Sequence, residues 1–205
     1  MYICPPKGDI NMCLGVRVNR EKIGNLMVLL ASEMPPLYHT KLIKLLYLID
    51  EKAVKEHGVP VTWLDYKVWQ YGPVAPEIYF IRDNGSVFSE FIHAEKEGAK
   101  TVITPVASFN DDRFSEYELE LIHRIISEYK TATSEQLVQI THEKDSLWDQ
   151  TKTENNIDFS SPVANISNCS IDLSRLIEKD EIKKDNYEGA KEMMYFRLPI
   201  NDFYL

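Results

Sequence analysis

The chain has 205 residues, a length that suits one domain with its own hydrophobic core. Its hydrophobic fraction of 44% and aromatic fraction of 11% exclude an intrinsically disordered protein. The formal net charge of −9 argues against a general nucleic-acid-binding protein, because affinity for phosphate depends on clustered Lys and Arg.

Cysteine usage and hydropathy indicate the compartment. The three cysteines, Cys4, Cys13 and Cys169, are odd in number and form no CxxC pair, which predicts free thiols in a reducing environment. The N-terminal segment lacks the apolar stretch of a signal peptide, and no apolar run approaches the roughly 20 residues that span a bilayer. We therefore expect a cytoplasmic protein that does not contact a membrane.

Two long helices open the predicted fold. They follow residues 1–18, which have no periodic pattern and are expected to form a flexible lead-in. Asn19 can cap a first helix over residues 20–33. A second helix is predicted over residues 40–57, with Gly58 just beyond its end.

The second helix has one charged face and one anomalous residue. At about 100° per residue, six charged side chains share one face: Lys41, Lys44, Glu51, Lys52, Lys55 and Glu56. Asp50 falls in the apolar arc opposite, where a carboxylate is costly unless it is paired or hydrogen-bonded. We expect Asp50 to be buried and bonded to a Tyr, Trp or backbone donor near the corner of residues 69–76 described below. The alternative is a carboxylate that anchors a binding site.

Residues 66–79 are the most distinctive segment of the chain. An alternating, aromatic-rich pattern predicts a strand over residues 61–70. Gly72-Pro73 is expected to leave this strand, because proline cannot donate to a ladder. The sequence therefore predicts a rigid corner after the strand.

A short helix follows the corner. Pro76 suits its first turn and Glu77 complements the helix dipole, so we expect the helix to run to about Arg82. Four aromatic side chains have two interpretations, packing in the core or an exposed surface that grips a partner protein. They are Trp69, Tyr71, Tyr79 and Trp148.

A β-hairpin is predicted next, with strands over residues 88–95 and 101–106 after a turn at residues 83–86. With the strand of residues 61–70, it should form a small antiparallel sheet packed on the helix of residues 40–57. The expected class is α+β, mainly α-helical, in one compact domain.

Two further helices are predicted by capping boxes at Ser115 and Thr133, over residues 115–130 and 134–142. This pair could form a helix-turn-helix, but its many glutamates match a phosphate backbone poorly.

The C-terminal part is less regular. Residues 152–169 are polar and long for a structureless loop, and a charged helix is predicted over residues 173–184. An apolar tail over residues 193–205 either docks on its own domain or joins two copies in a homodimer. The chain therefore divides into three predicted parts: a lead-in (1–18), a domain (19–151) and a C-terminal region (152–205).

Motifs of catalysis and metal binding are missing. The sequence has no P-loop, GxGxxG or GxSxG motif. His142-Glu143 begins like the HExxH motif of zinc proteases, but the fifth position is Ser146, and the five histidines lie far apart. We expect no enzyme activity, no cofactor and no metal.

Three segments resemble the Panacea domain, a family also described as SocA-like antitoxins or phage-associated proteins of bacteria and their viruses. They are Lys41–Asp50, the YGPV-x-PE-x-Y element within Trp69–Tyr79, and Thr141-His142 followed by Trp148. The resemblance covers about residues 22–151.

The resemblance implies an antitoxin, a protein-binding module that neutralises a cognate protein toxin, with a protease or chaperone as a further partner. By position, it assigns partner-binding or site-forming roles to Asp50, Trp69, Tyr71, Gly72, Pro73, Pro76, Glu77, Thr141, His142 and Trp148. We add Tyr79 as an aromatic residue of the same segment. The alternatives are a DNA-binding transcriptional regulator or a phage-associated regulatory protein, with DNA the less favoured partner.

Overall fold

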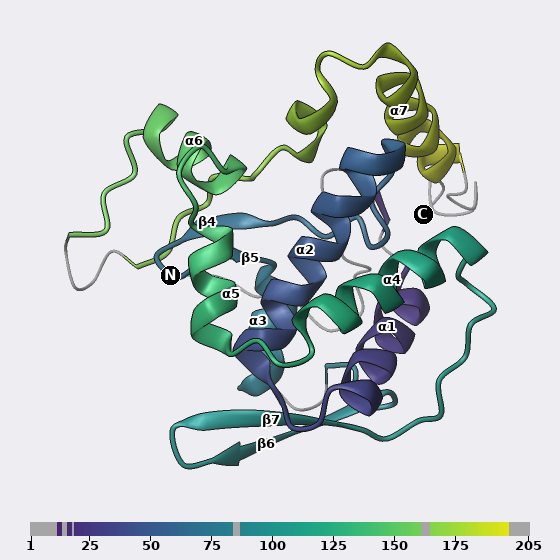
Figure 1. Ribbon diagram of the computed structural model, residues 1–205, viewed down its shortest axis with the longest axis vertical. Coiled ribbons are helices and arrows are strands. Elements are labelled where there is room, and N and C mark those ends of the chain that lie inside the picture. The colour runs from purple at the N-terminus through teal and green to yellow at the C-terminus, as the bar shows by residue number, and fades with distance from the viewer. Residues whose placement is uncertain (1–11, 14–15, 18, 84–86, 161–164, 197–205) are drawn as a thin grey trace, which may run out of the picture.

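The structure is mainly helical with small antiparallel sheets, which confirms the α+β class (Figure 1). It is a computed structural model and describes residues 12–13, 16–17, 19–83, 87–160 and 165–196. None of the helices in these ranges is long and apolar enough to cross a membrane.

The helix α2 (His39–His57) runs through the middle of the molecule (Figure 1). It contacts α4 (Glu116–Tyr129), α5 (Ser134–Thr141) and the 3-10 helix η2 (Leu173–Ile177). Gly58 ends α2 in the left-handed conformation with a φ of 85°, as predicted. A helix covered on so many sides needs the nearly all-round apolar surface that its sequence shows.

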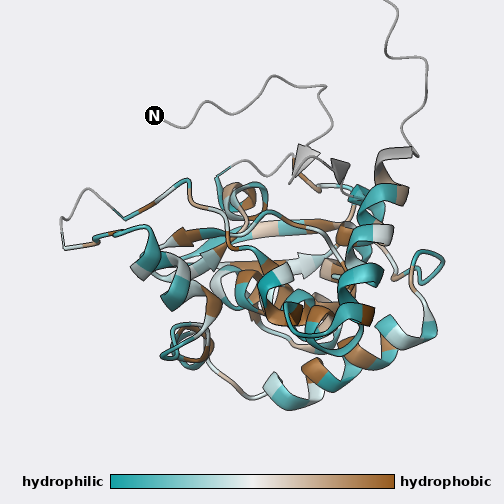
Figure 2. Ribbon diagram, turned by 90° about the horizontal axis from the view of Figure 1, so that it is seen from above, coloured by the Kyte–Doolittle hydropathy of each residue, from teal (hydrophilic) through white to brown (hydrophobic). Residues whose placement is uncertain are grey.

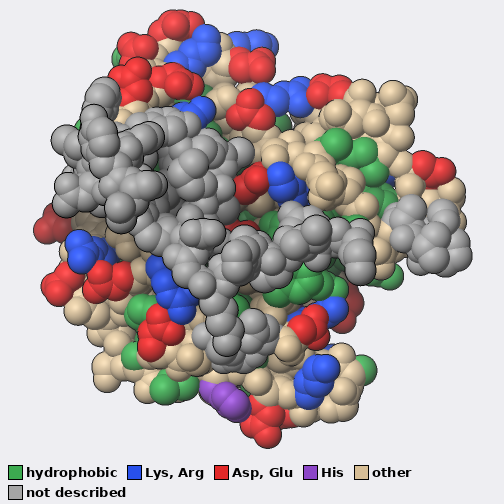
Figure 3. Space-filling view, turned by 180° about the vertical axis from the view of Figure 1, so that it is seen from behind, with side chains coloured by type: hydrophobic (Ala, Val, Ile, Leu, Met, Phe, Trp, Pro, Cys, Tyr) green, Lys and Arg blue, Asp and Glu red, His purple; other side chains and the backbone are tan. Residues whose placement is uncertain are grey.

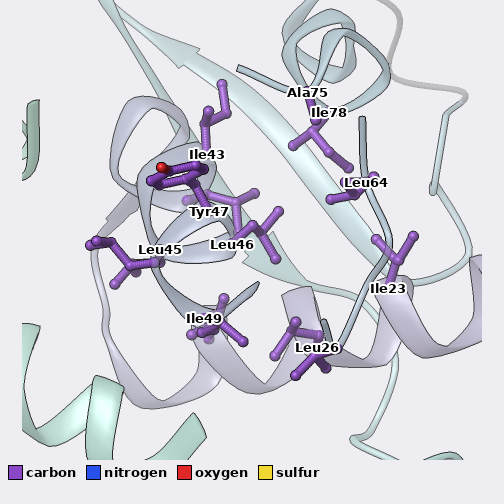
Figure 4. Packing of buried hydrophobic residues seen from close by; sticks show 14 of the residues in the cluster. Ile23, Leu26, Ile43, Leu45, Leu46, Tyr47, Ile49, Leu64, Ala75 and Ile78 are labelled. Carbon is purple, nitrogen blue, oxygen red and sulfur yellow. The ribbon is translucent and has the colours of Figure 1, made fainter. Parts of the chain in front are cut away.

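The core joins α2 to α1 (Arg20–Glu33), whose predicted Asn19 cap is present. Figure 4 shows Leu46 and Ile49 of α2 on the side that faces Ile23 and Leu26 of α1. Hydrophobic segments gather toward the middle of the molecule and hydrophilic ones toward its outside (Figure 2).

The main sheet has the order β3-β7-β6, with β3 (Leu37–Tyr38), β7 (Lys100–Pro105) and β6 (Ile92–Glu97) antiparallel. The predicted hairpin is therefore present, but its first strand begins at Ile92 and not at Phe88. Phe88 has a φ of 61°, which a strand does not allow.

The strand predicted over residues 61–70 is wrong in extent and in partner. Only β4 (Lys67–Trp69) forms, and it pairs with β5 (Gly72–Val74), separately from the main sheet. Residues before β4 cannot extend it, because Trp63 has a φ of 59° and the backbone N–H of Thr62 donates to Asp50.

Pro73 was predicted to leave the strand, and this prediction is also wrong. Pro73 lies within β5, opposite Val68. The two-stranded sheet ends at β5, so the missing N–H of Pro73 breaks no ladder bond. The next helix, α3 (Pro76–Tyr79), begins at Pro76 as predicted and continues as the 3-10 helix η1 (Phe80–Arg82).

The C-terminal part differs most from the prediction. The helix α6 (Leu147–Glu154) extends into the segment expected to be a loop, and the helix predicted over residues 173–184 is two elements, η2 and α7 (Glu181–Phe196). Acidic and basic side chains are interspersed at the upper end of the molecule, where α7 lies (Figure 3).

Three predictions fall partly outside the described residues. The turn at 83–86 is described only at Asp83, and the apolar tail only as far as residue 196. In the lead-in, β1 (Met12–Cys13) pairs with β2 (Val16–Arg17). The division into three parts stays a prediction.

Candidate functional site

Asp50 is fully buried, as expected from its place on α2. Its carboxylate accepts hydrogen bonds from the backbone N–H of Thr62 at 2.8 Å, the hydroxyl of Tyr66 at 2.8 Å and the hydroxyl of Thr62. Burial raises the pKa of Asp50 to about 6, although these hydrogen bonds oppose the rise. Burial and the Tyr and backbone donors are as predicted, but the donors belong to Thr62 and Tyr66 and not to the corner of residues 69–76. Asp50 thus ties the segment before β4 to α2.

The loop between β4 and β5 is held by side chains from three other helical segments. Trp148 of α6 donates its indole N–H to the carbonyl of Trp69 at 2.9 Å. His142, at the end of α5, places Nε2 at 3.1 Å from the carbonyl oxygen of Gln70. Lys44 of α2 donates from Nζ to the carbonyl of Pro73 at 2.8 Å. Side-chain nitrogen atoms therefore contact three backbone carbonyls in and beside this turn, which fixes its position.

Lys44 is buried although it lies on the charged face of α2, and only 1% of the residue is exposed. Its neighbour on that face, Lys41, is also buried and donates to the carbonyls of Lys130 and Ala132, just beyond α4. The chain around α4 and α5 covers this face of α2. Desolvation lowers the pKa of Lys44 to about 7.

Gly72 lies where these side chains converge. Its φ of +98° is one that residues with a Cβ rarely adopt. A Cβ at this position would lie 2.9 Å from Nζ of Lys44 and 2.9 Å from Oγ1 of Thr141. Both the backbone conformation and the close approach of Lys44 therefore require glycine here.

A cleft of about 600 Å³ opens in front of this framework. Its walls come from the start of α2, the β4–β5 loop, α3 with η1, the turn between β6 and β7, and the start of α5. Tyr71, at the tip of the loop, is 66% exposed at the cleft, and Ile166 beside the cleft is 48% exposed.

The predicted site residues divide into two groups. Trp69, Tyr71 and Tyr79 line the cleft. The remaining ones do not line it: Asp50, Gly72, Pro73, Pro76, Glu77, Thr141, His142 and Trp148. Of these, His142 and Trp148 bind the β4–β5 loop directly.

Several residues of the cleft were not found from the sequence. Lys44 was placed only on the charged face of the second helix, and Arg82, Lys100 and Ile166 belong to no motif. They meet only because the hairpin and the chain around residue 166 fold back toward α2. Within the described part of the chain, no group of His, Cys, Asp or Glu could hold a metal ion.

A family model described as antitoxin SocA-like, Panacea domain, matches residues 42–149. The chain belongs to this family. The match includes the buried loop framework, most of α2 and the aromatic wall of the cleft, whereas α7 lies beyond it. No curated protein and no solved structure matches the chain. Membership in an antitoxin family implies a toxin partner and suggests a non-catalytic protein.

Proposed function

We propose that this Panacea-domain protein neutralises a cognate protein toxin by binding it over Tyr71 and the adjoining cleft. The observation that supports the proposal most directly is the placement of Tyr71. The residue is 66% exposed, although the loop that carries it is fixed by three buried or half-buried side chains. A rigid, exposed tyrosine is a suitable anchor for a partner, because little conformational entropy is lost on binding.

The distribution of exposed apolar side chains supports the same surface. Among the described residues, the large hydrophobic side chains that are exposed are Tyr71, Val106, Ile166, Ile182 and Met193. Tyr71 and Ile166 both line the cleft, whereas the other three do not. Two apolar contacts and a concave surface in one place are typical of a protein-binding site.

The experiment is co-expression with the neighbouring small open reading frame, the candidate toxin. We expect that gene alone to arrest growth, and this chain to restore growth and to co-purify with its product. Tyr71→Ala should weaken the complex by about tenfold or more, as the loss of an interface anchor does. Val106→Ala removes an exposed apolar side chain away from the cleft and should leave the complex unchanged.

Two results would contradict the proposal. One is a harmless neighbour, and the other is rescue of growth without a detectable complex. Faster loss of the toxin in cells that contain an active protease would support an additional role as a proteolytic adaptor. A mobility-shift assay with the chain's own promoter tests the alternative of a DNA-binding regulator.

A further inference from the structure

Two walls of the cleft carry a cation stacked on a tyrosine. The guanidinium of Arg82 lies 4.0 Å from the ring centroid of Tyr79, and Nζ of Lys100 lies 4.6 Å from that of Tyr38. All four residues line the cleft. A tyrosine ring orients a cation without cancelling its charge. The stacking contacts alone therefore leave both cations charged.

Basic groups outnumber acidic ones among the exposed charged side chains of the cleft. These are Arg82, Lys100 and Glu135. Lys44 also lines the cleft, but its side chain is buried and donates to Pro73. Asp83 pairs with Arg82 at 3.3 Å, and Glu97 lies opposite Lys100 in the hairpin, but neither lines the cleft. Lys100 has no ion-pair partner among the residues that the structure describes. In a protein of net charge −9, such a surface selects for acidic ligands by charge complementarity.

Apolar side chains form a further part of the lining. Ile43, Trp69, Val74 and Val138 contribute to it, with Tyr71 and Ile166 exposed beside them. A purely ionic ligand would leave this apolar surface unused. An extended peptide can place an apolar side chain among these residues and carboxylates beside Arg82 and Lys100 at the same time.

We propose that the cleft binds an extended segment of a partner protein that carries carboxylates next to an apolar anchor side chain. The inference rests on the proposed function and adds to it the chemistry of the toxin segment. The peptide selection that tests the inference needs no toxin. A negative peptide selection can therefore be distinguished from a negative result in the toxin experiment.

The test is a selection of random dodecapeptides displayed on phage, with the full chain as bait. We expect the enriched peptides to carry Asp or Glu next to an aromatic or aliphatic residue. A fluorescein-labelled copy of an enriched peptide should bind more weakly at high salt, because both Lys100 and Arg82 are solvent-exposed. Lys100→Glu should weaken its binding by about tenfold or more.

Lys96→Glu is the matched control. It makes the same change of charge in the same hairpin, at an exposed residue that does not line the cleft, and binding should change less than twofold. No enrichment of acidic residues, or equal loss of binding in the two variants, would overturn the proposal. Displacement of the peptide by ATP at equal or lower concentration would also overturn it and would assign the cleft to a small phosphorylated ligand.

Discussion

The pKa of the buried ammonium of Lys44 differs strongly from that of a lysine in water, and the stability of the protein depends on pH as a result. The side chain lies in the protein interior and donates a hydrogen bond to the carbonyl of Pro73. Desolvation brings its pKa from 10.5 in water to about 7. Between pH 7 and 10.5, the unfolded chain therefore binds more protons at this residue than the folded chain does, and the free energy of unfolding rises with pH.

We predict that Lys44→Met removes this contribution. The slope of the free energy of unfolding between pH 7 and 9 should be more positive in the wild type than in the variant. The difference can reach about 1.4 kcal/mol per pH unit for one proton. Urea unfolding at pH 7, 8 and 9 measures it. Lys52→Met, a half-exposed residue of the same helix, is the control and should keep the wild-type slope. Equal slopes in the wild type and Lys44→Met would contradict the assignment.

Asp50 has the opposite dependence on pH. Its pKa is raised from 3.8 to about 6, so the folded chain binds more protons at this residue between those values. Its contribution to stability is complete below pH 3.8 and is lost as the pH rises through about 6.

The two residues also show what a helical wheel can predict. The burial of Asp50 followed from its place in the apolar arc, which any packing against α2 would cover. The burial of Lys44 did not, because it depends on α4 and α5 covering the opposite face as well. A one-dimensional pattern contains no information on how many neighbours a helix will have.

At the scale of elements, the structure around the β4–β5 loop depends both on residues close together in the sequence and on residues far apart in it. Pro76 at the start of α3 and the capping boxes of α4 and α5 were predictable, because each depends on residues three or four positions apart. The pairing of β4 with β5 was not predicted. It depends on a hairpin that contains a proline and on cover from residues 165–170, which are remote in sequence.

Gly72→Ala tests the close packing behind the loop. We predict a loss of stability on the order of 2 kcal/mol, because a Cβ would meet Lys44 and Thr141 at a φ of +98°. Thermal or urea unfolding gives the value.

Gly98→Ala separates the two causes. Gly98 also has a positive φ, +64°, but nothing lies within 4 Å of its Cβ position. It should therefore show the conformational cost alone and a smaller loss. If both variants lose the same stability, the crowding at Gly72 has no energetic effect.

For the whole molecule, α7 is an integral part of the fold although it lies outside the family match. Tyr187 is buried and its ring centroid lies 5.1 Å from that of Trp63. Asn186 donates to the carbonyl of His57 at 3.1 Å, at the end of α2. These contacts favour docking on the chain's own domain for this part of the C-terminal arm.

Deletion of residues 186–205 should therefore destabilise the protein and promote aggregation, because it exposes Trp63 to water and leaves the end of α2 without its donor. Deletion of residues 197–205 alone is the control, and it leaves the helix intact. Thermal unfolding and light scattering measure both. An equally stable monomer from a dimeric parent would show instead that the arm joins two copies.

The side chains that hold the β4–β5 loop also affect how long a partner bound at Tyr71 would stay bound. Its hydrogen bonds from Lys44, His142 and Trp148 span 29, 72 and 79 residues of the chain. Tyr71 is therefore presented only when α2, α5 and α6 are all in place. By mass action, a partner that recognises this assembled surface lowers the population of states in which α5 or α6 is locally open. A protease that first unravels α6 would release that partner before the core of the protein has unfolded.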